Sequence, residues 1–164
     1  MSKFLSNIRF KNFNEEHANT LVSTMLKYQE HFNICDFLQS DNDLGQSEDA
    51  ILDEYPTIDA FVHECGNEAC IAGWAALLMR DERLKAASET VTSISSRELA
   101  LYIGIDSSSA SAVASSQWVW ADVFGGVGTE FDPDNESWVL WSELTAQHGA
   151  DMINAIIGEY RRRL

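Results

Sequence analysis

The stretch CGNEACIAGWAALL, residues 65–78, decides how the rest of the chain is arranged. Residues 68–80 are apolar or small on nearly every side of a helix, and a helix of this kind lies in the middle of a domain. Gly66 permits a tight turn before the helix, and Asn67 is a residue type that caps helices. We therefore predict a central apolar helix over residues 68–80, around which the other helices pack.

Helix signals recur on both sides of this segment. Asn14 is a suitable cap for a helix that begins at Glu15, and a last helix over Thr145–Arg163 ends in three arginines, where the helix dipole favours cations. Shorter helices are expected within 47–54, after Pro56, in SSRELALYI before Gly104 and in DSSSASAVASSQW after it. The sequence thus predicts an all-α fold, a single compact domain over 1–164 with about five to six helices, and leaves room for a short hairpin near 124–141.

Length and composition narrow the class of protein. A chain of 164 residues is long enough for one domain with its own core. No apolar run approaches the roughly 20 residues that cross a bilayer, and residues 1–13 lack the pattern of a signal peptide. Three cysteines, an odd number, indicate reduced thiols rather than a disulfide framework. We expect a cytoplasmic protein.

Charge is the strongest signal in the composition. The formal net charge is −15 and the pI is near 4.4. Between Lys27 and Arg80 there is no lysine or arginine, and a second tract without them runs from Glu98 to Glu159. Such a surface repels DNA, RNA and anionic membranes, and it attracts basic proteins. We therefore expect no direct contact with nucleic acid or membrane.

Two cysteines near the central helix raise the question of a metal or thiol site. His63, Cys65 and Cys70 are the candidate ligands, and Cys35 or another histidine would complete a zinc tetrahedron. The spacing lacks the paired ligands of structural zinc sites, and the negative surroundings disfavour a thiolate. We predict that Cys70 packs as a small core residue, and we assign no catalytic residue, metal or cofactor. A small metal- or thiol-dependent enzyme centred on His63, Cys65 and Cys70 is the alternative hypothesis.

Three other motifs give weaker evidence for a binding site. GGVG at 125–128 lacks the lysine and hydroxyl residue of a phosphate-binding loop, and 132–137 lacks the glycine and glutamate of a calcium loop. Residues 97–115 follow the outline of a helix-turn-helix. Their second helix offers serine and alanine, and nearby only Gln117 is able to read a base edge. A helix-turn-helix-like regulator is therefore a second alternative, and the charge argues against it.

Three blocks in the order FNICDFL, CGNEACIAGWA and LALYIGIDSSSASAVASSQWVW resemble a group of small uncharacterised bacteriophage and bacterial proteins. That group carries a Cys-Gly-Thr-x-x-Cys-Ile-Ala-Gly-Trp-Ala motif. The resemblance covers roughly 32–160. This chain departs from the pattern at Ile34 and Asn67 and in a longer acidic insertion after Phe37. The resemblance implies a phage-type origin and a helical fold, and it implies no reaction.

Together these signals favour a non-enzymatic acidic interaction protein. We interpret the chain as a phage-encoded inhibitor of a host defence or DNA-processing protein, of the anti-CRISPR or anti-restriction type. It would bind a basic nucleic-acid-binding groove in the host cytoplasm as a partial DNA mimic. The expected contacts are carboxylates of the two tracts: Asp36, Asp41, Asp43, Glu48, Asp49, Asp53, Glu54, Asp132, Asp134 and Glu136.

Two further interpretations concern the surface. The acidity is equally consistent with a role in solubility alone. Four of the five tryptophans, at 118, 120, 138 and 141, lie close together in the sequence. If two or more of them are exposed, we expect them to anchor a protein partner, because aromatic side chains dominate binding energy at interfaces.

Overall fold

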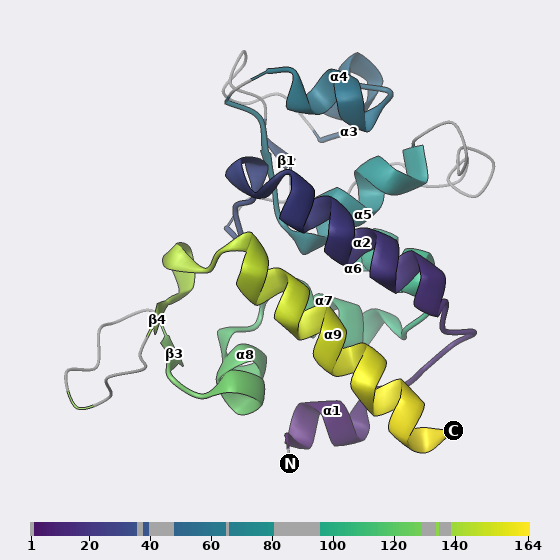
Figure 1. Cartoon of the computed structure of the whole chain (residues 1–164), viewed down its shortest axis with the longest axis vertical. Helices are drawn as coiled ribbons and strands as arrows, with labels where there is room; N and C mark the ends of the chain where they lie inside the picture. The colour runs from purple at the N-terminus through teal and green to yellow at the C-terminus, as the bar shows by residue number, and fades with distance from the viewer. Residues whose placement is uncertain are drawn as a thin grey trace.

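The structure is a computed structural model that describes residues 2–35, 38–39, 48–64, 66–80, 96–128, 134 and 139–164 (Figure 1). Its α-helices are α1 (Lys3–Asn7), α2 (Glu15–Lys27), α3 (Glu48–Glu54), α4 (Ile58–Val62), α5 (Ile71–Arg80), α6 (Ser96–Ile103), α7 (Ser107–Ser115), α8 (Gln117–Phe124) and α9 (Ala146–Arg163). The 3₁₀ helices are η1 (Gln29–His31) and η3 (Trp141–Glu143). The all-α class is confirmed, and the described residues form more helices than the five to six expected because several are short.

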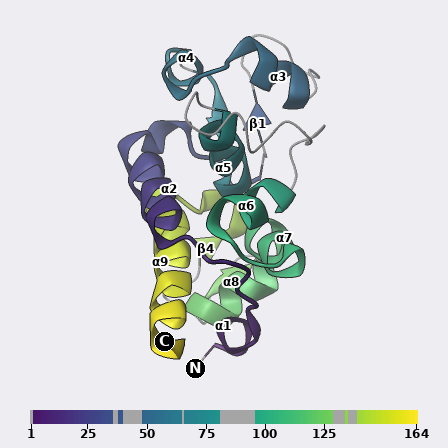
Figure 2. The ribbon, with the colours of Figure 1, turned by 90° about the vertical axis from the view of Figure 1, so that its right-hand side faces the viewer.

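α5 lies at the centre of the fold, where α2, α6 and α7 contact it (Figure 2). Every residue from Ile71 to Met79 is buried. The ring of Trp74 is fully buried, lies 5.9 Å from Phe61 in an edge-on arrangement and stacks 6.0 Å from Tyr28. Such aromatic pairs add to the large apolar area that each ring buries. The central apolar helix is therefore confirmed.

The start of this helix differs from the prediction. Glu68 and Ala69 form β2 (Glu68–Ala69), which pairs antiparallel with β1 (Leu38–Gln39). Asn67 does not cap α5, because it is fully buried and bonded elsewhere. Its side-chain Nδ2 donates to the Phe61 carbonyl (2.9 Å), and its backbone carbonyl accepts from His31 Nδ1 (2.7 Å). The helix begins at Ile71 because Asn67 links α4 to η1 instead.

The long helices α2 and α9 lie side by side along one flank of the molecule (Figures 1 and 2). Asn14 caps α2 as expected, because its Oδ1 accepts from the His17 amide (2.9 Å). Thr145 caps α9, and its amide donates to His148 Nδ1 (3.0 Å) to complete a capping box. Both predicted helices are confirmed. They bury one apolar stripe each, with Ala18, Leu21 and Met25 on α2 and Met152, Ile153, Ile156 and Ile157 on α9.

Residues 124–141 contain a strand pair, but not a hairpin. β3 (Val127–Gly128) pairs with β4 (Val139–Leu140) in parallel, with Val127 opposite Val139. A tight turn can join antiparallel strands only. Parallel strands run in the same direction, so they need a longer connection. The predicted location is therefore right and the predicted hairpin geometry is wrong.

The chain between α1 and α2 pairs with the turn after α6. The Lys11 amide donates to the Gly104 carbonyl (2.8 Å), and the Asn14 amide donates to the Ile103 carbonyl (2.9 Å). Gly104 has a φ of +77°, in the left-handed region that favours glycine. A Cβ at Gly104 would lie 2.4 Å from the carbonyl oxygen of Asn12. The predicted end of α6 at Gly104 is confirmed, and glycine is required there by both conformation and space.

We expect Trp74→Ala to lower the free energy of unfolding by about 3–5 kcal/mol, because it leaves a large cavity in the centre of the core. Chemical denaturation followed by circular dichroism measures the change. Trp118→Ala is the matched control: Trp118 is 78% exposed, so its replacement should change stability by less than about 1 kcal/mol. Equal effects of the two substitutions would contradict the central position of Trp74.

We expect Gly104→Ala to destabilise the protein by about 2–4 kcal/mol, because the new Cβ meets backbone and the left-handed conformation is strained for alanine. Gly158→Ala is the control. Nothing lies within 4 Å of a Cβ at Gly158 in α9, so alanine should raise stability there by up to about 1 kcal/mol. Thermal melts of the two variants should therefore shift in opposite directions, and a shared direction would refute this account.

Candidate functional site

One end of the molecule carries exposed carboxylates. α3 and α4 form this end, opposite the end at which α1 and the C-terminus lie (Figures 1 and 2). Asp53 and Glu54 are exposed on α3, and Asp59 and Glu64 are exposed on and just after α4. The sequence from Tyr28 to Met79 has no lysine or arginine to neutralise them. We call these four residues the acidic end.

The structure places only part of the predicted contact set. Asp53, Glu54 and Asp134 are exposed, and Glu48 and Asp49 belong to α3. The other five predicted carboxylates lie outside the described residues: Asp36, Asp41, Asp43, Asp132 and Glu136. β3 and β4, which flank Asp134 in the sequence, lie away from α3 and α4, towards the other end of the molecule (Figure 1). The acidic end therefore belongs to the first tract.

At the opposite end of the molecule, the three arginines at the end of α9 form ion pairs with glutamates. Glu159 is buried and accepts from Arg162 Nε (2.8 Å) and Arg163 Nε (2.6 Å). The Arg163 guanidinium also donates to backbone carbonyls of the α1 region, including those of Leu5 (2.7 Å) and Ile8 (2.8 Å). These hydrogen bonds fasten α1 to the end of α9. The arginines predicted to complement the helix dipole are therefore also a structural clamp.

Hydrogen bonds from this clamp change the acidity of Glu159. The Arg162 guanidinium, with a further contribution from Arg163, lowers the pKa of Glu159 to about 2. On α2, Glu15 pairs with Arg161, which also lowers the Glu15 pKa below its usual value. Glu15 and Glu159 are thus paired with arginines. The carboxylates of the acidic end lie in a stretch of sequence without lysine or arginine, and Lys27, just before it, interacts electrostatically with Asp59.

The candidate metal and thiol ligands do not form a cluster in the described part of the chain. His63 is exposed at the end of α4, Cys70 is 1% exposed in the core, and Cys65 lies outside the described residues. The described residues contain no group of three or more His, Cys, Asp or Glu side chains arranged to hold a metal ion. Cys70 instead lines a small cavity of about 170 Å³ together with Cys35 and Trp141. This placement supports the interpretation of Cys70 as a core residue.

The helix-turn-helix outline exists as a helix pair, α6 followed by α7. The exposed face of α7 consists of Ser107, Ser108, Ser111 and Ser115 and carries no cation. The Oε1 atom of Gln117 is buried, so this side chain does not present its carbonyl to a base. α7, the expected recognition helix, therefore offers no cation to a phosphate, and the cation of the pair is Arg97 on α6.

The tryptophans are mostly packed. Trp120 is fully buried, and its Nε1 donates to the Val113 carbonyl (2.8 Å). Trp141 is half-buried and meets Trp120 edge-on at 5.8 Å, whereas Trp118 is exposed on α8. Trp138 lies outside the described residues. Among the described tryptophans of this group one is exposed, so two exposed tryptophans are not found within the described residues.

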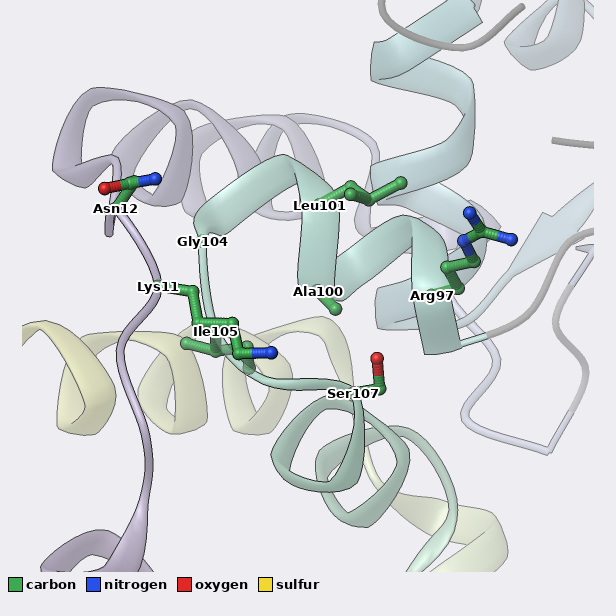
Figure 3. A pocket seen from close by; sticks show the side chains of 8 residues that line it. All are labelled: Lys11, Asn12, Arg97, Ala100, Leu101, Gly104, Ile105 and Ser107. Atoms are coloured by element: carbon green, nitrogen blue, oxygen red, sulfur yellow. The ribbon is translucent and has the colours of Figure 1, made fainter. Parts of the chain in front are cut away.

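Sequence reasoning missed a cleft between the chain before α2 and the α6–α7 turn (Figure 3). Its volume is about 410 Å³, and its lining includes two cationic side chains, Lys11 and Arg97. These residues are far apart in the sequence, and no motif links them. Only the pairing of the segment before α2 with the turn at Gly104 brings them to the same cleft.

Comparisons of the chain with protein-family models, with curated proteins and with solved structures found no match. Among the described residues no helix has the length and apolar character needed to cross a bilayer.

We expect the contribution of the Glu159 clamp to stability to depend on pH. Because folding lowers the Glu159 pKa from about 4.5 to about 2, its contribution is fully present above pH 4.5 and is lost as the pH falls from 4.5 towards 2. Melts of Glu159→Gln and of the unmodified protein between pH 7 and pH 2 test this. The variant should melt at a lower temperature at pH 7, and the gap should close on acidification. A gap that stays constant with pH would exclude an ionic role for Glu159.

Proposed function

We propose that this protein is a non-enzymatic binding protein whose acidic end docks on a basic, nucleic-acid-binding surface of another protein. The observation that carries the proposal is the contrast between the two ends of the molecule. Arginines at one end are held by Glu15 and Glu159, while the carboxylates at the other end extend from a stretch of 52 residues, Tyr28–Met79, without a lysine or arginine. Exposed charge of one sign gathered at one end favours a partner of the opposite sign.

The positions of the carboxylates support a contact surface rather than a role in the fold. Asp53 and Glu54 belong to α3, Asp59 belongs to α4, and all three are exposed. Two separate helices thus present carboxylates at the same end (Figure 2). Partners that bind nucleic acid carry lysines and arginines spaced to meet phosphates, and carboxylates can occupy the same positions.

Such a protein would act by competition. A partner whose basic groove is covered by this acidic end loses its access to nucleic acid, so the consequence of docking is inhibition. Electrostatic steering would make the association fast at low salt and slower as salt rises. The finer proposal, an anti-defence inhibitor encoded by a phage, rests on the resemblance of the CGNEACIAGWA block and belongs to the same hypothesis.

A pull-down from bacterial lysate, followed by competition with duplex DNA, tests the proposal. We expect recovery of a basic DNA- or RNA-binding protein whose affinity for nucleic acid falls when this protein is added. The triple variant Asp53→Asn, Asp59→Asn, Glu64→Gln should weaken the complex about 3- to 160-fold, because each exposed ion pair contributes roughly 0.2–1 kcal/mol. Kd is measured by calorimetry at several salt concentrations.

The control variant carries the same change of net charge elsewhere: Glu16→Gln, Glu143→Gln, Asp151→Asn. All three residues are exposed and lie outside the acidic end. This variant should retain nearly full affinity. If both triple variants weaken binding equally, the contact depends only on total charge and the acidic end is not the docking surface. A partner whose affinity is indifferent to salt and to both variants would refute the proposal.

A further inference from the structure

The cleft beside the α6–α7 turn has the size and rigidity of a small-molecule site. Its volume of about 410 Å³ lies within the roughly 300–1,000 Å³ typical of ligand pockets. One wall comes from the chain before α2, and the other comes from α6 and the start of α7 (Figure 3). Eight residues line it: Lys11, Asn12, Arg97, Ala100, Leu101, Gly104, Ile105 and Ser107.

Backbone contacts fix both walls. The Lys11 amide donates to the Gly104 carbonyl, and the Asp106 amide donates to the Arg9 carbonyl (2.9 Å). Between these bonds Phe10 and Ile105 form an antiparallel bridge. The cleft is therefore built on paired backbone and a helix, and its shape does not depend on long side chains. Binding to such a pre-formed site costs little ordering entropy.

The charge of the lining is opposite to that of the molecule. Among the described residues that line the cleft, two are cations, Lys11 and Arg97, and none is an aspartate or glutamate. Asp106, next to the cleft in sequence, caps α7 by accepting from the Ser109 amide (3.1 Å). Within the described part of the chain Lys11 has no ion-pair partner, so its ammonium is available to an anion.

Figure 3 shows how the polar groups lie. The side chain of Lys11 extends along Ile105, and its ammonium faces the space between Ala100 and the hydroxyl of Ser107. The guanidinium of Arg97 lies at the far rim and turns outward. A carboxylate in the cleft would thus meet Lys11 and Ser107 first, and Arg97 would contribute mainly at longer range.

An apolar surface adjoins these polar groups. Leu101 is 52% exposed, although α6 buries most of its other apolar residues. Ala100 and Ile105 complete the apolar part of the lining. A ligand that covered Leu101 while it paired with Lys11 would gain both apolar burial and an ionic hydrogen bond.

We propose that this cleft binds a small amphiphilic organic anion, a carboxylate joined to a short apolar chain. The carboxylate pairs with the Lys11 ammonium and accepts from the Ser107 hydroxyl, and the apolar chain covers Leu101. This site is separate from the acidic end and does not depend on the function proposed for it.

Amide NMR spectra of the full chain with four probes test the proposal. Hexanoate has the complete chemistry, acetate lacks the apolar chain, hexanol lacks the charge, and inorganic phosphate supplies charge alone. We expect saturable shifts at Lys11, Leu101, Gly104 and Ser107 with hexanoate, and a Kd at least about tenfold lower than that for any of the other three. Phosphate binding as tight as hexanoate binding would overturn the assignment of the ligand class, because the site would then recognise charge alone.

Variants separate this site from a general effect of charge. Lys11→Met should weaken hexanoate binding about tenfold, whereas Lys3→Met, an equal change of charge on exposed α1, should leave it unchanged. Leu101→Ser should reduce the preference for hexanoate over acetate. The backbone amide of Lys11 survives in Lys11→Met, so the cleft keeps its shape, and an unchanged amide spectrum without ligand checks this. Absence of saturable shifts with hexanoate, or equal effects of the two lysine variants, would overturn the proposal.

Discussion

Burial of α5 on all sides is the constraint on which the rest of the structure depends. A helix with one apolar stripe needs one neighbour, but a helix buried from Ile71 to Met79 must be surrounded. α2, α6 and α7 contact it directly, and Phe61 reaches Trp74 from α4. Segments from both halves of the chain are thereby brought to one core. The long helix α9 then needs only to cover α2, and it does so with a single apolar stripe.

The same constraint fixes where charge can lie. Because α5 and its neighbours fill the centre, most charged residues lie at the two ends and on the outer faces, and Glu98 on α6 is a buried exception. At one end the cations serve the fold: Arg163 fastens the carbonyls of the α1 region, and Glu159 holds Arg163 in place. At the other end Asp53, Glu54 and Asp59 are exposed on α3 and α4. The difference between the ends, rather than the net charge, is what supports a contact surface.

Local signals in the sequence predicted the parts of the fold that depend on near neighbours. Asn14 caps α2, Gly104 ends α6 and the apolar run forms α5, because each outcome is determined within a few residues of the signal. Asn67 shows where this reasoning fails. Its cap propensity is local, but a buried residue must satisfy its polar groups. The side-chain Nδ2 of Asn67 donates to the Phe61 carbonyl, and the backbone carbonyl of Asn67 accepts from the His31 ring.

Features that depend on contacts between distant segments could not be predicted from local sequence signals. The parallel β3–β4 pair depends on the path of the chain between the strands, so the expected hairpin was wrong. The cleft depends on the approach of the chain before α2 to the turn at Gly104, and no spacing within either segment encodes that approach. For the same reason the sequence pointed to an acidic tract but gave no sign of a cationic cleft.

A protein with a net charge of −15 can still hold an anion, because charges act locally in salt water. At physiological ionic strength the Debye length is about 8 Å, and exposed charges farther apart than this are largely screened. α5 and α6 separate the acidic end from the α6–α7 turn (Figure 2). An anion in the cleft therefore experiences mainly Lys11, the hydroxyl of Ser107 and the apolar surface of Leu101. A basic partner at the opposite end experiences mainly the carboxylates of α3 and α4. Net charge describes how the molecule behaves at a distance, and the distribution of cations decides what can bind at each surface.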